Sequence, residues 1–165
     1  MGMGHSDVID QRWAMSTESI ELRQIKLLSD EIMPLVFEAE SEGHRFVRRL
    51  RDEWNSGVNR FQGTGEFLLS AHLGGCLVAV GGLNHDLYSS TEGVGRLRHV
   101  YVSSGARRQG VGTMLVKRIM ESAAQTFSTL RLRTTTTDAA AFYERLGFQS
   151  TKEETATHII KLRAS

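Results

Sequence analysis

The stretch RLRHVYVSSGARRQGVGTML at residues 96–115 joins a strand pattern directly to a helix pattern. Its first residues alternate between apolar and polar, which is typical of a β-strand, and its last residues place apolar side chains at helical spacing. Between them lies a turn with two arginines and two glycines. A helix that begins at such a turn presents backbone N–H groups without partners and a partial positive charge, and this combination binds anions.

The glycines of this turn are Gly110 and Gly112, and without side chains they let a ligand approach the backbone closely. Arg107 and Arg108 add positive charge, so the turn predicts a phosphate-bearing ligand. The alternative is that the glycines only let the backbone bend and the helix pack closely. A P-loop kinase has little support, because the stretch lacks both GxxxxGK(S/T) and the third glycine of GxGxxG.

The length and composition indicate one domain. The chain has 165 residues, 40% of them hydrophobic, with no shift in composition along it. We interpret residues 1–16 as a flexible N-terminal segment and residues 17–165 as a single domain. Twenty basic and nineteen acidic residues give a net charge of +1, which argues against a general nucleic-acid binder, so any anion site is local.

No apolar run reaches the roughly 18 residues that cross a bilayer, and the N-terminus lacks the apolar core of a signal peptide. We therefore expect a cytoplasmic protein without a membrane partner. The single cysteine, Cys76, lies in the apolar run GGCLVAVGG, where it predicts a buried strand residue and no disulfide.

The hydrophobic pattern predicts the element order β, α, α, β, β, β, α, β, α, β, with a short extra strand at 148–150. The strands are expected at 19–26, 66–73, 75–85, 96–102, 129–136 and 154–163, and the helices within 28–57 (split near Gly43), 109–127 and 138–147. Ser29 and Asp30 are expected to cap the first helix and Asp138 the last. Val111, Met114, Leu115 and Ile119 are expected on one buried helical face.

The stretch RHVYVSSGARRQGVGTML resembles the acyl-CoA signature of the GNAT superfamily of N-acetyltransferases, which is Arg or Gln, two residues, Gly, one residue, and Gly or Ala. Arg107, Gly110 and Gly112 fill it. AAAFYERLGF, at residues 139–148, resembles the second recurring segment of the family at the expected distance. The resemblance covers roughly residues 18–163. It implies an α/β (α+β) fold with a mixed, mostly antiparallel twisted sheet of six or seven strands, splayed at the central strands and flanked by about four helices.

The resemblance also implies acetyl-CoA as co-substrate, no metal, and transfer of the acetyl group to a primary amine of a small molecule or peptide by direct attack in a ternary complex. It suggests no nucleic-acid partner and allows for a homodimer. Matching the family's positions, the Val100 amide would stabilise the oxyanion and Tyr143 would act as general acid. The cofactor-binding residues implied are Val100, Tyr101, Val102, Arg107, Arg108, Gln109, Gly110, Val111, Gly112, Thr113, Thr136, Asp138, Phe142, Tyr143 and Arg145.

The sequence departs from the family at the general base. Some members carry a glutamate where this chain has Arg96, which stays protonated and cannot accept a proton. The candidates elsewhere, acting directly or through water, are Glu92, His85, Asp86 and His99, with Glu92 and His85 slightly ahead. Strand alternation places His99 on the face opposite Arg96 unless a bulge swaps the faces.

Three readings of function therefore remain open from the sequence. The first is an N-acetyltransferase, in which Arg96 and Arg98 would suit an acceptor that carries a carboxylate or phosphate. The second is a non-catalytic domain that senses or assembles around acyl-CoA, because the strand glutamate is missing. The third is a domain with an unrelated phosphate ligand at the glycine turn.

Overall fold

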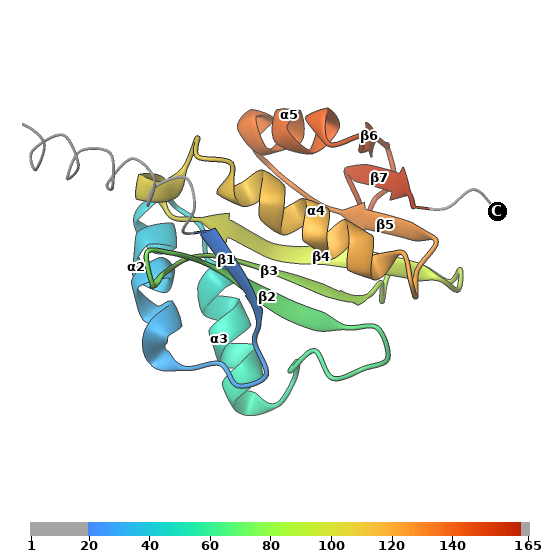
Figure 1. The fold of residues 1–165 in the computed structure, drawn as a ribbon. Helices are drawn as coiled ribbons and strands as arrows, with labels where there is room; N and C mark the ends of the chain where they lie inside the picture. Colours follow the sequence, from blue (N-terminus) through green and yellow to red (C-terminus); the bar gives the residue numbers. More distant parts are fainter. Residues whose placement is uncertain (1–19, 163–165) are drawn as a thin grey trace, which may run out of the picture.

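The computed structural model describes residues 20–162, which form a seven-stranded sheet in the order β1-β2-β3-β4-β5-β7-β6 (Figure 1). The predicted flexible segment at 1–16 lies outside the described residues. The strands are β1 Ile20–Gln24, β2 Phe67–Leu73, β3 Cys76–His85, β4 Val94–Val102, β5 Thr129–Leu132, β6 Gln149–Ser150 and β7 His158–Lys161. β4 pairs with β5 in parallel, and every other pairing is antiparallel. The expected mixed, mostly antiparallel sheet is confirmed.

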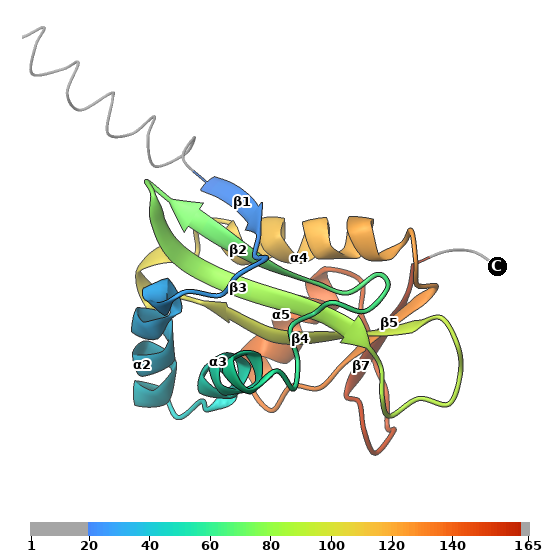
Figure 2. The same ribbon diagram turned by 90° about the horizontal axis from the view of Figure 1, so that it is seen from below.

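Helices cover both faces of the sheet. The 3-10 turn η1 (Asp30–Ile32), α2 (Met33–Ser41) and α3 (Phe46–Ser56) lie on one face, and α4 (Val111–Ala123) and α5 (Thr137–Arg145) lie on the other (Figures 1 and 2). Each layer has its own core: Val36, Leu50 and Tyr101 belong to the α2–α3 core, whereas Leu97 and Leu115 belong to the α4–α5 core. The sheet thus separates two packed layers.

A β-bulge interrupts β4. Val80 on β3 faces Tyr101 and Gly82 faces Arg98, so two residues of β4, His99 and Val100, oppose only one residue of β3. His99 has a φ of 61°, which is the left-handed region. The bulge swaps the faces of the strand as the sequence analysis allowed, because Leu97 packs with the α4–α5 core and Tyr101 with the α2–α3 core.

The sheet opens beside this bulge. β4 pairs with β5 only through Val94, Gly95 and Arg96, opposite Thr129, Leu130 and Arg131. From Leu97 to Val102, β4 has no strand partner on its β5 side in the described structure. This splay at the central strands confirms the expectation from the sequence and leaves a free backbone edge.

Several local predictions are confirmed. A turn at Gly43, with a φ of 87°, separates α2 from α3. Gly74 and Gly75, also left-handed, form the β2–β3 hairpin turn. Pro34 lies in the first turn of α2 as expected, whereas Ser29 caps the preceding turn η1, which contains Asp30, and the N-cap of α2 is Ile32 without a side-chain cap.

Three predictions are wrong. Cys76 is exposed, because it is the first residue of β3 beside the hairpin turn and not a mid-strand residue. Met114 is 43% exposed, since it lies at the border of the buried face that Val111, Leu115 and Ile119 form. Asp138 does not cap α5, because Thr136 Oγ1 accepts the capping hydrogen bond from the Ala139 amide at 3.1 Å.

Candidate active site

The start of α4 presents a row of free backbone amides. Gly110 is the N-cap residue, and no side chain of the described residues caps the helix. Within residues 20–162, no carbonyl or side chain accepts a hydrogen bond from the amides of residues 108–113; the first helical bond there is Met114 N–H to Gly110 O at 3.0 Å. Six consecutive amides at the positive end of a helix form a site suited to an anion with several oxygens, such as a diphosphate.

The two glycines of the turn serve different purposes. Gly110 has a φ of 81° and open space around the position of a Cβ atom, so its absent side chain permits the left-handed backbone and leaves room for a ligand. At Gly112 a Cβ atom would lie 3.3 Å from Val102 Cγ2 and 3.5 Å from Phe142 Cζ. Gly112 therefore also allows α4 to pack closely against β4 and α5, which is the alternative that the sequence left open.

The free edge of β4 lies beside this turn. Ser103 N–H donates to Val78 O on β3 at 2.7 Å. Because amide directions alternate along an extended strand, the N–H groups of Val102 and Val100 point away from β3 and toward the side where β5 has splayed away. These two groups can pair with an extended ligand as a strand would.

The helix α5 brings the second motif to the same place. The Phe142 ring contacts the region of Val102 and Gly112, and the Tyr143 ring packs 5.0 Å from Phe142 and 5.6 Å from Phe148. Tyr143 is buried, and no described residue hydrogen-bonds to its hydroxyl. Burial raises the pKa of Tyr143, so the hydroxyl is in its neutral form at neutral pH.

Arg107, the first residue of the motif, is held by the protein itself. Its Nε donates to Val102 O at 3.0 Å and its Nη2 to Glu42 Oε1 at 2.7 Å, while its guanidinium lies 5.5 Å from the centre of the Tyr101 ring. The hydrogen bond from Arg107 lowers the pKa of Glu42. Arg107 thus ties the turn to the end of α2, a helix that no motif in the sequence connects with the site.

The remaining predicted cofactor residues lie at the rim. Arg108 and Arg145 are exposed, Asp138 is exposed in the first turn of α5, and Gln109 Nε2 donates to Gly105 O at 3.0 Å. Arg108 has a φ of 64°, which is unfavourable for a residue with a side chain. Thr136 uses its hydroxyl to cap α5.

The two leading base candidates lie at the opposite end of β4. His85 faces Gly95, five residues before Val100, which corresponds to about 16 Å along a strand. Its Nε2 lies 2.6 Å from Thr64 O and its ring 4.9 Å from that of Phe127. Glu92 is exposed in the loop before β4. The structure does not bring either side chain to the splay.

The other two candidates for the general base, Asp86 and His99, are buried and held by contacts within the protein. Asp86 is fully buried, 3.0 Å from Arg131 and 3.4 Å from Arg96, and it accepts the Tyr88 amide at 2.8 Å. His99 lies in the bulge with Nδ1 3.1 Å from Phe46 O and with no partner for Nε2 in the described structure. Burial lowers its pKa to about 3, so the ring stays neutral.

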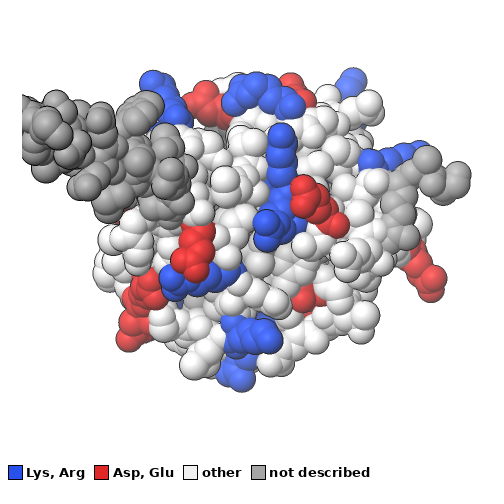
Figure 3. Space-filling model, viewed as in Figure 1, with Lys and Arg blue, Asp and Glu red and all other residues white. Residues whose placement is uncertain are grey.

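Charges are dispersed around these elements. On the face shown in Figure 3, Lys and Arg side chains alternate with Asp and Glu, without a large area of one sign. Among the described residues, no cluster of three or more His, Cys, Asp and Glu side chains could hold a metal ion. No helix in residues 20–162 is long and apolar enough to span a bilayer.

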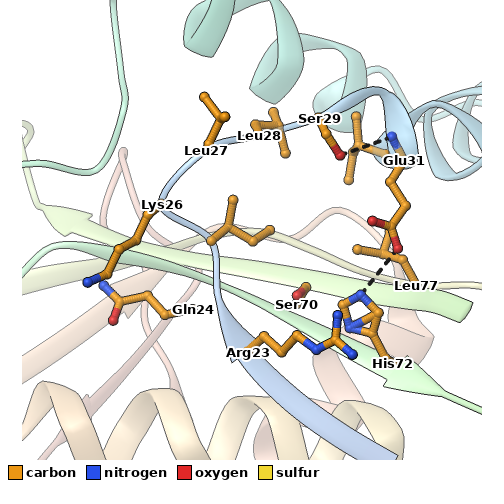
Figure 4. A pocket seen from close by; sticks show the side chains of 12 residues that line it. Arg23, Gln24, Lys26, Leu27, Leu28, Ser29, Glu31, Ser70, His72 and Leu77 are labelled. Carbon is orange, nitrogen blue, oxygen red and sulfur yellow. Dashed lines mark hydrogen bonds and ion pairs between the residues drawn. The ribbon is translucent and has the colours of Figure 1, made fainter. Parts of the chain in front are cut away.

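A hollow of about 160 Å³ lies elsewhere, beside the segment that joins β1 to η1 (Figure 4). His72 is buried in its wall, with Nε2 3.3 Å from Glu31 Oε1, and burial lowers its pKa. None of the residues that line the hollow belongs to β4, α4 or α5. It is therefore separate from the candidate site.

The open mixed sheet, with an uncapped helix beginning beside its free edge, is the architecture of acyl-CoA-dependent transferases, the class that the sequence resembles. The chain belongs to the GNAT family of acetyltransferases: the model of the Acetyltransferase (GNAT) family matches residues 25–148. Members of this family use acetyl-CoA as acyl donor.

Solved structures agree with this assignment. A proposed acetyltransferase from Exiguobacterium sp. 255-15 is 30% identical, with a TM-score of 0.76 over 86% of this chain and 93% of its own. The GNAT N-acetyltransferase YhbS from Escherichia coli, solved in complex with CoA, has a TM-score of 0.65 at 14% identity over 88% of this chain and 82% of its own. A GNAT acetyltransferase from Staphylococcus aureus Mu50 has a TM-score of 0.67 at 15% identity, covering 87% and 100%. No functionally curated protein sequence matches the chain significantly.

Proposed function

We propose that this protein is an N-acetyltransferase that transfers the acetyl group of acetyl-CoA to a primary amine of a small molecule or peptide by direct attack in a ternary complex. The observation that carries the proposal is the row of six free amides at residues 108–113, next to the free edge of β4. The amides of residues 108–113 would hold the diphosphate, and backbone groups of β4 at Val100 and Val102 would pair with the pantetheine arm. When bound, acetyl-CoA supplies an activated acetyl thioester.

The reaction then requires three things: a donor for the oxyanion, a proton for the thiolate and removal of a proton from the amine. The Val100 amide would stabilise the oxyanion; removal of such a donor typically costs about 3 kcal/mol of transition-state stabilisation. The Tyr143 hydroxyl, which is protonated at neutral pH, would give its proton to the departing thiolate. The proton of the attacking amine would leave through water, because Arg96, the last β4 residue paired with β5, stands where some family members carry a glutamate.

The competing function is a non-catalytic acyl-CoA-binding domain. The specific observation in its favour is Arg96, whose guanidinium donates to Thr155 O at 2.7 Å and lies 3.4 Å from Asp86. Arg96 therefore has a structural role at the point where β4 and β5 separate, and it is not a base. Domain organisation as a single domain over residues 17–165 is part of the proposal.

The test combines binding and turnover. We expect acetyl-CoA to raise the melting temperature where ATP and NAD do not, since a ligand at 100 times its Kd stabilises the native state by about 2.7 kcal/mol. Release of free thiol is then measured across amino acids, polyamines, aminoglycosides and peptides with free N-termini. Tyr143→Phe should lose turnover and keep its affinity for acetyl-CoA. A wild type that binds acetyl-CoA but acetylates none of these amines would favour the non-catalytic domain.

A further inference from the structure

Two carboxylates of α2 hold the turn between β4 and α4. Glu38 accepts hydrogen bonds from the Ser104 amide at 2.6 Å and from the Ser103 hydroxyl at 3.0 Å. Glu42, the residue after α2, accepts one from Arg107 at 2.7 Å. The Tyr101 hydroxyl lies between them, 3.0 Å from Glu38 and 2.7 Å from Glu42. We call Glu38 and Glu42 the carboxylate pair.

The carboxylate pair fixes the turn at two separate places. Glu38 holds its first residues, Ser103 and Ser104, and Glu42 holds Arg107 in its middle. The next residue, Arg108, has a φ of 64°, a conformation that persists only where surrounding contacts impose it. The six free amides begin at this residue. The position of this turn therefore depends on contacts that α2 supplies from the other side of the sheet.

The charges of the carboxylate pair and Arg107 argue against direct electrostatic attraction of an anionic ligand by these side chains. Burial acts to raise the pKa of Glu38, but hydrogen bonds from Ser104, Ser103 and Tyr101 outweigh it and lower that pKa. The hydrogen bond from Arg107 lowers the pKa of Glu42. Both carboxylates are thus ionised at neutral pH, and with Arg107 they leave a net charge of about −1. By its field alone, such a cluster would repel an anionic ligand at the neighbouring amides.

We infer that Glu38 and Glu42 are positioning residues for the acyl-CoA donor: they hold the β4–α4 turn in the shape that directs the amides of residues 108–113 at one diphosphate. This inference rests on the proposed function, because it assumes that the diphosphate of CoA binds there. It adds α2, which carries no part of the GNAT signature, to the donor site. It also explains why Arg107, despite its charge, is occupied by the protein.

The test uses Glu38→Gln and Glu42→Gln, which keep the size of each side chain and remove its charge. Glu121→Gln on the exposed side of α4 is the matched control, because it removes one negative charge and no hydrogen bond or ion pair among the described residues. Calorimetry should give a Kd for CoA about tenfold higher in each of the two variants and unchanged in the control; hydrogen bonds to charged groups are of this size. The Kd for pantetheine, which lacks the diphosphate, is measured by NMR titration and should change much less.

The sign of the effect separates the explanations. Unchanged or tighter binding of CoA in both variants would overturn the inference, since tighter binding means that the carboxylates act only through their field. Equal losses for CoA and pantetheine would overturn it too, because they indicate general damage to the fold. Should Glu38→Gln fail to fold, the Kd of Glu42→Gln for CoA is the deciding measurement, because Glu42 is partly exposed at the end of α2. If the wild type binds no CoA, it is the proposed function that fails.

Discussion

His99 should make the stability of this protein fall as the pH drops from 7 to 5. The side chain is 7% exposed in the bulge of β4, its Nδ1 lies 3.1 Å from Phe46 O, and its Nε2 has no partner within the described chain. A second proton would place a buried positive charge near Arg98 and Arg49. Burial, followed by the repulsion from Arg98, lowers the pKa of His99 from 6.5 to about 3.

The magnitude follows from the two pKa values. In the unfolded chain His99 binds a proton below about pH 6.5, whereas the folded protein leaves it neutral down to about pH 3. The unfolded state therefore gains protons first, and the free energy of unfolding decreases as the pH falls through this window. Between pH 7 and pH 5 the loss from this one residue is about 2 kcal/mol.

The assay is urea unfolding of the wild type and of His99→Asn at pH 7 and pH 5. Asparagine tolerates the left-handed backbone of this position, and its amide nitrogen can donate to Phe46 O in place of Nδ1. The variant loses some packing at both pH values, but its residue 99 does not titrate. The stability advantage of the wild type should therefore shrink by about 2 kcal/mol from pH 7 to pH 5. An advantage that is equal at both pH values would mean that the folded protein does not hold the pKa of His99 below that of the unfolded chain.

Two further predictions concern the β4–α4 turn and the buried ion pairs where β4 and β5 separate. Gly110→Ala forces a side chain onto a φ of 81° and should lower the free energy of unfolding in urea by about 1–2 kcal/mol. It should also weaken the binding of CoA. Gly105→Ala, with nothing within 4 Å of its Cβ position, should change the free energy of unfolding by less than about 0.5 kcal/mol. Asp86→Ala leaves the buried Arg131 with one ion-pair partner fewer and should lower the free energy of unfolding by about 3 kcal/mol, while the exposed Asp52→Ala should change it by less than about 1 kcal/mol. Equal effects of Asp86→Ala and Asp52→Ala would contradict the assignment of Asp86 as a structural residue.

The elements that carry the donor site could be predicted from the sequence because their signals are local. The alternation before Ser103, the glycines of the turn and the helical spacing after them all lie within one stretch of twenty residues. The α5 motif adds Phe142 and Tyr143, and in the structure the Phe142 ring lies beside Gly112. The roles assigned to these residues remain predictions.

The surroundings of the site depend on contacts between distant residues, which hydrophobic periodicity does not reveal. Arg96 meets Asp86 across the β3–β4 loop and Thr155 from the segment before β7, and both contacts require the register of three strands. Glu38 and Glu42 show only that two acids lie one helical turn apart. Their spacing indicates a shared polar helix face, but nothing near them in the chain indicates that this face contacts Tyr101 and Arg107.

The bulge at His99 shows why the faces of β4 could be predicted only conditionally. Strict alternation would put Leu97 and Tyr101 in one core, yet they belong to opposite layers, and one extra residue accounts for the change. That extra residue turns Tyr101 toward α2, where it meets Glu38 and Glu42, and Val100 toward α4 and the splay. A single irregularity in one strand therefore produces both the anchor on α2 and the direction of the Val100 amide. A variant that straightened β4 would be expected to disturb both together, because neither layer can keep its contact once the alternation is restored.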